Sequence, residues 1–193
     1  IIKERIIGRY KEIDPNIIKV ITNGFDTHEF SDNFKENINT GKFTVAHVGT
    51  LSWIRSESFR SFCFAISEMI REMPSIVDKM SVELVGDVNQ ECRNIVRELD
   101  LEKIVVYKGY LPHSEAFRVM READVLFLPI DNRLTNQAGC YVVPGKLYDY
   151  IGSATPILMV GPRHCDASDI IINDGFGVTF EISQIDEIKK FLL

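Results

Sequence analysis

The sequence lacks the short motifs that mark the commonest nucleotide-binding folds. It contains neither a G-x-x-x-x-G-K-[ST] phosphate loop nor a G-x-G-x-x-G fingerprint, which counts against ATPases and nicotinamide-dependent enzymes. Cysteine is also scarce, and no two cysteines form a C-x-x-C pair; they are Cys63, Cys92, Cys140 and Cys165. This spacing favours unpaired thiols in a reducing compartment, so we expect a cytoplasmic protein without a zinc site, a disulfide framework or redox chemistry.

Basic residues are too few for a nucleic-acid surface. The 193 residues include 22 basic and 28 acidic side chains, a formal net charge of −6, whereas binding along a phosphate backbone needs a basic face. The same balance leaves room for one local phosphate site. No apolar run approaches the roughly 20 residues of a membrane span, and the first residues lack a signal-peptide pattern. Since the sequence does not begin with Met, we expect a fragment of a longer protein.

Histidine ligation of a metal is not expected either. The histidines have no ligand-like spacing with one another or with acidic residues; they are His28, His47, His113 and His164. His47 lies within an apolar strand and is interpreted as a core residue with satisfied hydrogen bonds. Only His113 occupies a position where a ligand could lie.

Strand and helix patterns alternate through most of the chain. Apolar runs predict strands at 43–48, 82–85, 104–107, 124–129, 156–160 and 177–180. Helical periodicity between and after them predicts helices at 57–73, 92–99, 114–123 and 166–173, a short helix opening at 144, and a last one from 184. This alternation predicts an α/β fold, a doubly wound parallel sheet of the Rossmann type. Before it we expect a helix over 2–13, a strand over 17–22 and a polar, linker-like run to Gly41.

The stretch from Tyr141 to Met159 has the composition of a helix start, a short helix and a new strand. Pro144 suits the first turn, so the N–H groups of Gly145 and Lys146 would point out of the helix start, where anions bind. Asp149 follows one helical step later. This pairing suits a nucleotide diphosphate, with the lysine on phosphate and the carboxylate on ribose hydroxyls. The alternative is an ordinary βα unit whose charges are solvated.

Residues 144–151, Pro-Gly-Lys-Leu-Tyr-Asp-Tyr-Ile, and the Ala-Thr-Pro-Ile-Leu that follows them resemble a signature of GT-B glycosyltransferases of the family-4 type, Pro-x-Lys-Leu-Phe-Glu-Tyr-Leu-(small)-x-x-Pro-(apolar). Residues 20–26 are similar to the segment by which these enzymes pass into the donor domain, although an ordinary strand and turn would read the same way. The resemblance implies that residues 1–40 are the end of the acceptor domain and an interdomain linker. Residues 41–193 would then form the sugar-nucleotide-binding, C-terminal half of a GT-B enzyme.

Glycines follow three of the predicted strands, at Gly49, Gly86 and Gly109. Each permits either a tight turn or the close approach of a ligand, and all three are expected at the carboxyl edge of the sheet, where such folds bind ligands. The resemblance implies that the 49–55 loop lies near the diphosphate and that the 109–113 loop surrounds the base through Gly109, Tyr110, Leu111 and His113. The loop after the fourth strand, up to 143, is long enough to suggest a function.

The chain departs from the family pattern at two places. The family usually has an Arg directly after the first glycine and a Lys before the next helix, whereas this chain has Thr50 and, near the second position, Arg55. Arg55 is either a second diphosphate cation or an exposed charge flanking a helix. Many members also carry two Glu residues separated by seven others; Asp149 matches the second, and Tyr141 occupies the first.

The resemblance as a whole implies the donor-binding domain of a retaining glycosyltransferase, which transfers a sugar from a UDP- or GDP-linked donor in glycan or polysaccharide synthesis. No cofactor, metal or nucleic acid is expected, and no catalytic residue is identified.

The partner would be the N-terminal acceptor domain of the same protein, so this chain alone should bind donor without transferring sugar, and any peripheral membrane association should come from that other half. The rival is a non-catalytic nucleotide- or sugar-binding module; a sugar-nucleotide epimerase would need more acid and base groups.

Overall fold

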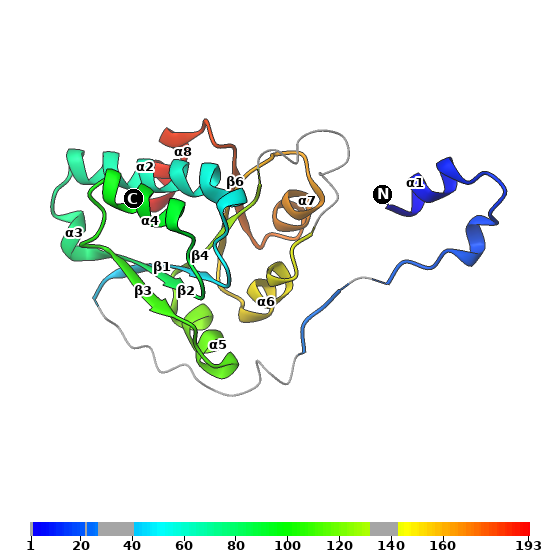
Figure 1. The fold of residues 1–193 in the computed structure, drawn as a ribbon, viewed down its shortest axis with the longest axis horizontal. Helices are drawn as coiled ribbons and strands as arrows, with labels where there is room; N and C mark the ends of the chain where they lie inside the picture. The colour runs from blue at the N-terminus through cyan, green and yellow to red at the C-terminus, as the bar shows by residue number, and fades with distance from the viewer. Residues whose placement is uncertain (1, 22, 27–40, 132–142) are drawn as a thin grey trace.

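The computed structural model describes residues 2–21, 23–26, 41–131 and 143–193. Within these residues a single parallel sheet has the order β3-β2-β1-β4-β5-β6 (Figure 1). Its strands are β1 Phe43–Val48, β2 Met80–Val85, β3 Val105–Gly109, β4 Val125–Pro129, β5 Ile157–Val160 and β6 Gly177–Phe180. The helices are α1 Ile2–Arg9, α2 Ser56–Glu72, α3 Ile76–Lys79, α4 Gln90–Glu98, α5 His113–Glu122, α6 Lys146–Ser153, α7 Asp166–Asn173 and α8 Ile185–Leu192, with short 3-10 turns η1 Pro15–Ile17 and η3 Trp53–Arg55. The predicted doubly wound parallel sheet is confirmed.

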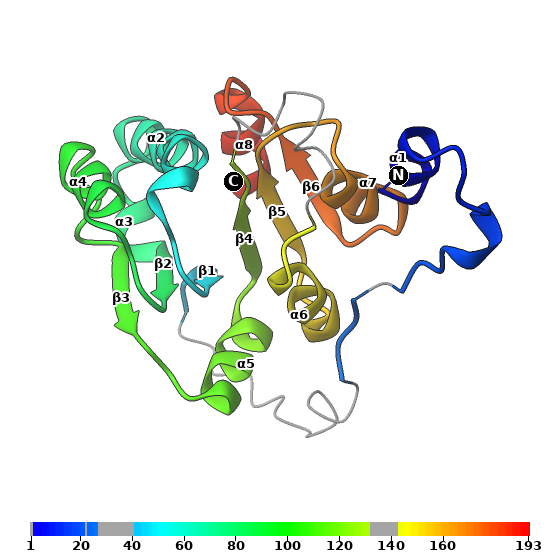
Figure 2. The ribbon, with the colours of Figure 1, turned by 45° about the vertical axis from the view of Figure 1, so that its right-hand side comes forward.

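Helices cover both faces of the sheet (Figure 2). One apolar cluster joins α2, α3, α4 and α8 to the strands, and the other joins α5, α6 and α7 to the opposite face. Alternate residues of a strand enter different clusters: Phe127 packs on the α2 side and Leu126 on the α6 side. The central strands are therefore buried on both faces, which explains their nearly continuous apolar sequence.

The direction of winding reverses beside β1. This strand pairs with β2 on one side and with β4 on the other, so the connections after it run to opposite sides and leave a crevice at the carboxyl ends. Tyr150 of α6 hydrogen-bonds to β1 beside this crevice. Its fully buried hydroxyl accepts a 2.9 Å hydrogen bond from the Val48 N–H, at the last residue of β1. This bond ties α6 to the end of β1.

The N-terminal segment differs from the sequence prediction. The first helix ends at Arg9, before the predicted end at 13, and the strand predicted over 17–22 is wrong within the described residues. There Asp14 caps the 3-10 turn η1 by accepting a hydrogen bond from the Asn16 N–H, 2.9 Å away. The next residues belong to no described helix or strand, and Ile21 is 92% exposed. Figure 1 shows α1 and η1 set apart from the sheet.

Two predictions fall partly outside the described residues. The linker-like run lies there over 27–40, and the long loop after β4 lies there over 132–142, including Tyr141. Among the helices that the structure describes, none combines the length and apolar character needed to cross a bilayer.

Candidate functional site

The three predicted glycines lie together at the carboxyl edge of the sheet. Gly49, Gly86 and Gly109 all have positive φ angles, of 110°, 102° and 65°. The Gly86 N–H donates to the Gly109 carbonyl at 2.7 Å, and a Cβ on Gly86 would lie 2.9 Å from the Gly49 carbonyl carbon. Side chains are thus excluded between the first two loops. The prediction that these glycines share one edge is confirmed. Backbone packing against Gly49 leaves no room for a side chain at Gly86, whereas a Cβ on Gly109 would meet nothing within 4 Å.

The start of α6 faces the same edge. Gly145 already has helical angles (φ −53°, ψ −39°), and the helix begins without a side-chain cap. Leu147 and Tyr148 donate the first backbone hydrogen bonds, to Pro144 and Gly145. The N–H groups of Gly145 and Lys146 therefore point out of the helix start, as the sequence predicted.

One neighbour of this helix start was not anticipated. A Cβ on Gly145 would lie 3.9 Å from the Asn23 side-chain nitrogen. Asn23, predicted from the sequence to lie in a turn or in the segment leading into the donor domain, therefore lies beside α6. The segment that precedes the sheet reaches its carboxyl edge.

Lys146 turns back across Gly49 into the centre of this edge. Its Nζ lies 3.2 Å from His47 Nε2, and a Cβ on Gly49 would come within 2.9 Å of the same Nζ. Burial, followed by the positive charge of Arg55, lowers the pKa of Lys146 to about 7, while the Asp149 carboxylate acts in the opposite direction. The ammonium group is thus partly desolvated, so an anion that approached it would gain more than it would from a fully hydrated lysine.

His47 lies beneath Lys146 and is 1% exposed. Its Nδ1 is 3.0 Å from the Phe127 carbonyl oxygen, which can only accept, so Nδ1 carries the proton. Nε2 is then the acceptor that faces Lys146. Burial, followed by the charge of Lys146, lowers the pKa of His47 to about 3. The interpretation of His47 as a buried, hydrogen-bonded core residue is confirmed, but its contact with Lys146 was missed.

Arg55 contributes a second positive charge. Its guanidinium donates a 3.0 Å hydrogen bond to the Thr50 carbonyl, which folds the arginine back over its own loop at η3. Its charge contributes to the lowered pKa of both Lys146 and His47, so it lies within electrostatic range of them. We call His47, Gly49, Arg55 and Lys146 the lysine corner. Two basic side chains beside a neutral histidine suit a ligand that carries more than one negative charge.

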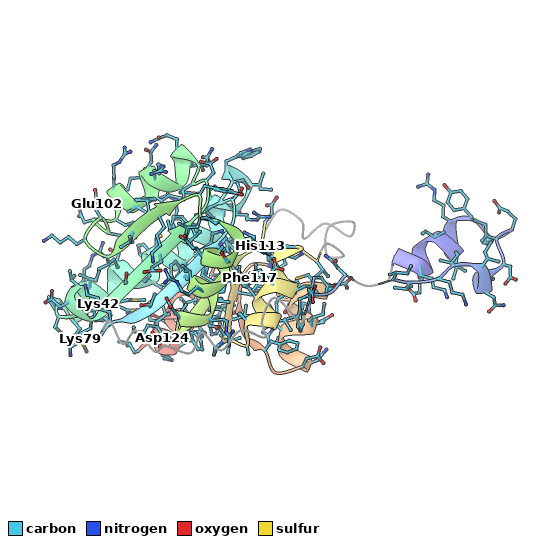
Figure 3. All side chains as sticks on the ribbon, turned by 90° about the horizontal axis from the view of Figure 1, so that it is seen from below. Lys42, Lys79, Glu102, His113, Phe117 and Asp124 are labelled. Carbon is cyan, nitrogen blue, oxygen red and sulfur yellow. The ribbon has the colours of Figure 1, made fainter. Side chains whose placement is uncertain are left out.

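The 109–113 loop has a different character. Tyr110 is 91% exposed, whereas Leu111 packs on the α6-side core. His113 is the first residue of α5 and meets the Phe117 ring edge to face, with centroids 4.4 Å apart (Figure 3). This loop therefore offers an aromatic surface to solvent at the end of β3.

Comparison with known proteins identifies the fold. The chain matches no protein-family model, and no curated protein is significantly similar in sequence. Among solved structures, WaaG, a glycosyltransferase involved in lipopolysaccharide biosynthesis, has a TM-score of 0.71 at 16% identity over 98% of this chain and 51% of its own. Anabaena HepE in complex with UDP has a TM-score of 0.69 at 15% identity over 98% of this chain and 50% of its own. The chain has the fold of a GT-B glycosyltransferase half.

The half in question is the C-terminal one. The C-terminal domain of LpcC, a group 1 family glycosyl transferase from Francisella tularensis, matches 88% of this chain over 86% of its own length, with a TM-score of 0.59 and 16% identity. The chain spans about half the length of WaaG and HepE. The resemblance seen in the signature of residues 144–151 thus extends to the fold of a GT-B C-terminal domain.

The predicted site residues at the carboxyl edge of the sheet fall into two groups. Gly49, Arg55 and Lys146 form one corner, and Asp149, half-buried on α6, influences the charge of that corner. Tyr110 and His113 belong to the separate, exposed surface at the end of β3. Within the parts of the chain that the structure describes, no cluster of three or more His, Cys, Asp or Glu side chains could hold a metal ion.

Proposed function

We propose that this chain is the donor-binding half of a retaining glycosyltransferase that takes a sugar from a UDP- or GDP-linked donor, in cytoplasmic glycan or polysaccharide synthesis. The observation that carries the proposal is the position of Lys146, whose Nζ lies over Gly49 and 3.2 Å from His47 at an open helix start. The UDP seen with HepE, a GT-B structure of the same fold, supports a nucleotide diphosphate as the ligand class.

In this proposal the lysine corner binds the diphosphate. Lys146 and the N–H of Gly145 neutralise the charge that develops when the sugar departs, which is the main chemical contribution that this half can make. Asp149 accepts hydrogen bonds from the ribose, and the loop of Tyr110 and His113 lies along the base. The acceptor and the groups facing the anomeric carbon belong to an N-terminal domain of the same protein, and the chain alone binds donor without transfer.

A non-catalytic binding module on the same fold is the second candidate. It is favoured by Thr50, which stands where the family usually has an arginine, and by Arg55, whose guanidinium already donates to the Thr50 carbonyl. Sugar-transfer activity of the full-length protein separates the two, because nucleotide binding alone is common to both.

The direct test is calorimetric titration of the chain with UDP, GDP and ADP and with the corresponding nucleosides. Lys146→Met should weaken binding of the preferred diphosphate about 10- to 100-fold, the scale of a charge-assisted hydrogen bond of about 1.5–3 kcal/mol, and should leave nucleoside affinity unchanged. Lys190→Met removes the same charge from an exposed position on α8 and serves as the control. Equal losses for nucleoside and diphosphate would refute the assignment of Lys146.

The pH dependence of the same titration adds a second test. An unliganded lysine with a pKa of about 7 loses its charge as the pH rises above that value, whereas a bound diphosphate holds the proton on. Diphosphate affinity should therefore fall between pH 7 and 9 in the wild type. The Lys146→Met variant should show a flat profile over this range.

A further inference from the structure

A lysine that is to meet a diphosphate must be held in place without being neutralised. The side chain of lysine carries about 2 kcal/mol of rotamer entropy, which is lost when the ammonium is fixed. A carboxylate partner would fix it but would also cancel its charge. The neighbour within hydrogen-bonding distance of Lys146 is an imidazole nitrogen, at 3.2 Å, and the Asp149 carboxylate acts on the lysine through its charge.

The imidazole is itself fixed from behind. His47 Nδ1–H donates to the Phe127 carbonyl at 3.0 Å, and the His47 ring meets the Phe127 ring at an interplanar angle of 61°, with centroids 6.2 Å apart. This bond selects the tautomer whose Nε2 lone pair points at Lys146. A fixed acceptor occupies one N–H of the ammonium and leaves two for ligand oxygens.

We infer that His47 is the positioning residue of the diphosphate site, a neutral acceptor that holds the Lys146 amino group over Gly49 without adding a negative charge that would compete with the ligand. The role rests on the proposed function, because it presumes that Lys146 binds a diphosphate. The other charged or polar groups that act on His47 or Lys146 are Arg55, Asp149, the Tyr150 hydroxyl and the Thr50 backbone, which hydrogen-bonds to the histidine. Burial keeps His47 neutral among them, consistent with its lowered pKa of about 3.

Two substitutions separate the two ring nitrogens. His47→Gln places a side-chain oxygen or nitrogen near the former Nε2 and can still accept from Lys146. His47→Asn reaches only the former Nδ1, so it can still donate to the Phe127 carbonyl but loses Lys146. We expect His47→Asn to weaken UDP or GDP binding about 5- to 10-fold, the scale of one hydrogen bond, and His47→Gln to stay within about 2-fold of the wild type.

Nucleoside affinity and a double-mutant cycle test whether the effect passes through Lys146. Neither variant should alter uridine or guanosine binding, and His47→Asn should have no further effect in a Lys146→Met background. An equal loss of nucleoside binding, or an undiminished effect without the lysine, would overturn the positioning role. If the wild type bound no diphosphate at all, the proposed function would fail, and a measurement without nucleotide is then needed.

Long-range ¹H–¹⁵N spectra of the four histidines supply that measurement on the unliganded chain. At pH 7 the His47 signals, assigned by their loss in His47→Asn, should show the neutral tautomer protonated at Nδ1. The Nε2 resonance should shift in Lys146→Met and stay in place in Lys190→Met. A proton on Nε2, or an Nε2 signal that ignores Lys146, would refute the positioning role whatever the nucleotide results.

Discussion

The lysine corner and the 109–113 loop lie at the same edge of the sheet, yet they are built in opposite ways. In the corner, Lys146 crosses Gly49 with almost no spare room and rests on a buried histidine. In the loop, a Cβ on Gly109 would meet nothing within 4 Å, and Tyr110 is almost fully exposed. The lysine corner is therefore preorganised before a ligand binds, whereas the 109–113 loop has room to adapt to a ligand.

The contrast matches the chemistry that we propose for each region. A diphosphate that leaves with the electron pair of the sugar bond gains from fixed charges, since preorganised groups need no rearrangement at the moment of reaction. A base is held by stacking and edge contacts that tolerate some movement. The difference therefore predicts that changes in the corner affect stability and diphosphate binding together, while changes in the loop affect neither strongly.

Gly49→Ala against Gly109→Ala is the sharpest test of this difference. Both glycines have positive φ, but only at Gly49 would the new methyl also lie 2.9 Å from Lys146 Nζ. We expect Gly49→Ala to cost about 3 kcal/mol of unfolding free energy, because a φ of 110° lies outside the left-handed helical region that alanine can enter, and to lose most of the diphosphate affinity, because the lysine must move. Gly109→Ala, at a φ of 65°, should cost about 1 kcal/mol. Urea denaturation and calorimetry measure the two effects. If Gly49→Ala kept the wild-type diphosphate affinity, the lysine would not need the space over Gly49, and the contrast between the corner and the loop would fail.

The buried His47 should make the free energy of unfolding depend on pH. The pKa of His47 is about 3 in the folded chain against an ordinary value of 6.5, so between these values the unfolded chain binds a proton that the folded chain does not. Stability from this group is complete above pH 6.5 and is lost as the pH falls towards 3. The wild type should be about 2 kcal/mol less stable at pH 5 than at pH 8 through His47 alone.

His47→Gln removes this titration and should flatten the corresponding part of the stability profile, as followed by urea unfolding at each pH. His113→Gln, at the exposed start of α5, is the matched control from the loop and should keep the wild-type profile. A His47→Gln profile parallel to the wild type would show that His47 is already accessible to protons.

Sequence reasoning predicted the sheet well because buried parallel strands and amphipathic helices leave strong periodic patterns. The strands 43–48 and 177–180 and the helix 166–173 are observed at the predicted residues. The strand predicted at 17–22 failed because apolar, β-branched residues were interpreted without knowing whether a neighbouring strand was available. Asp14 and Pro15 supply a local turn instead, and Ile21 remains exposed.

The site was predictable as a set of positions but not as a set of contacts. The three edge glycines and the open helix start follow from local pattern, since turns and first helical turns have their own residue preferences. The pairing of His47 with Lys146 joins residues 99 positions apart and leaves no local trace. Likewise, no motif announces that Asn23 lies beside Gly145.

Asp149 lies on α6, one helical step after Lys146, and its substitution tests the proposed contact with the ribose. If it accepts from the ribose, Asp149→Asn should weaken UDP or GDP binding by about 1 kcal/mol and affect the 2′,3′-dideoxy analogue much less. Its carboxylate also raises the pKa of Lys146, so an effect through the lysine is the competing explanation. That effect would reduce binding of both ligands equally, and calorimetry with the two diphosphates at pH 7 decides between them.

Tyr110→Ala, in the 109–113 loop, should have the smallest effect on stability and on binding. Because the ring is 91% exposed, its removal should change the free energy of unfolding by no more than about 0.5 kcal/mol, as for most surface substitutions. If the ring lies against the base, affinity should drop by about 1 kcal/mol or less. The loss should be the same for nucleoside and diphosphate, since the phosphate groups lie at the lysine corner. Calorimetry with the nucleoside and the diphosphate checks this equality. A loss of affinity confined to the diphosphate would show that Tyr110 acts on the phosphate groups, as Lys146 does, and would contradict the proposed difference between the two regions.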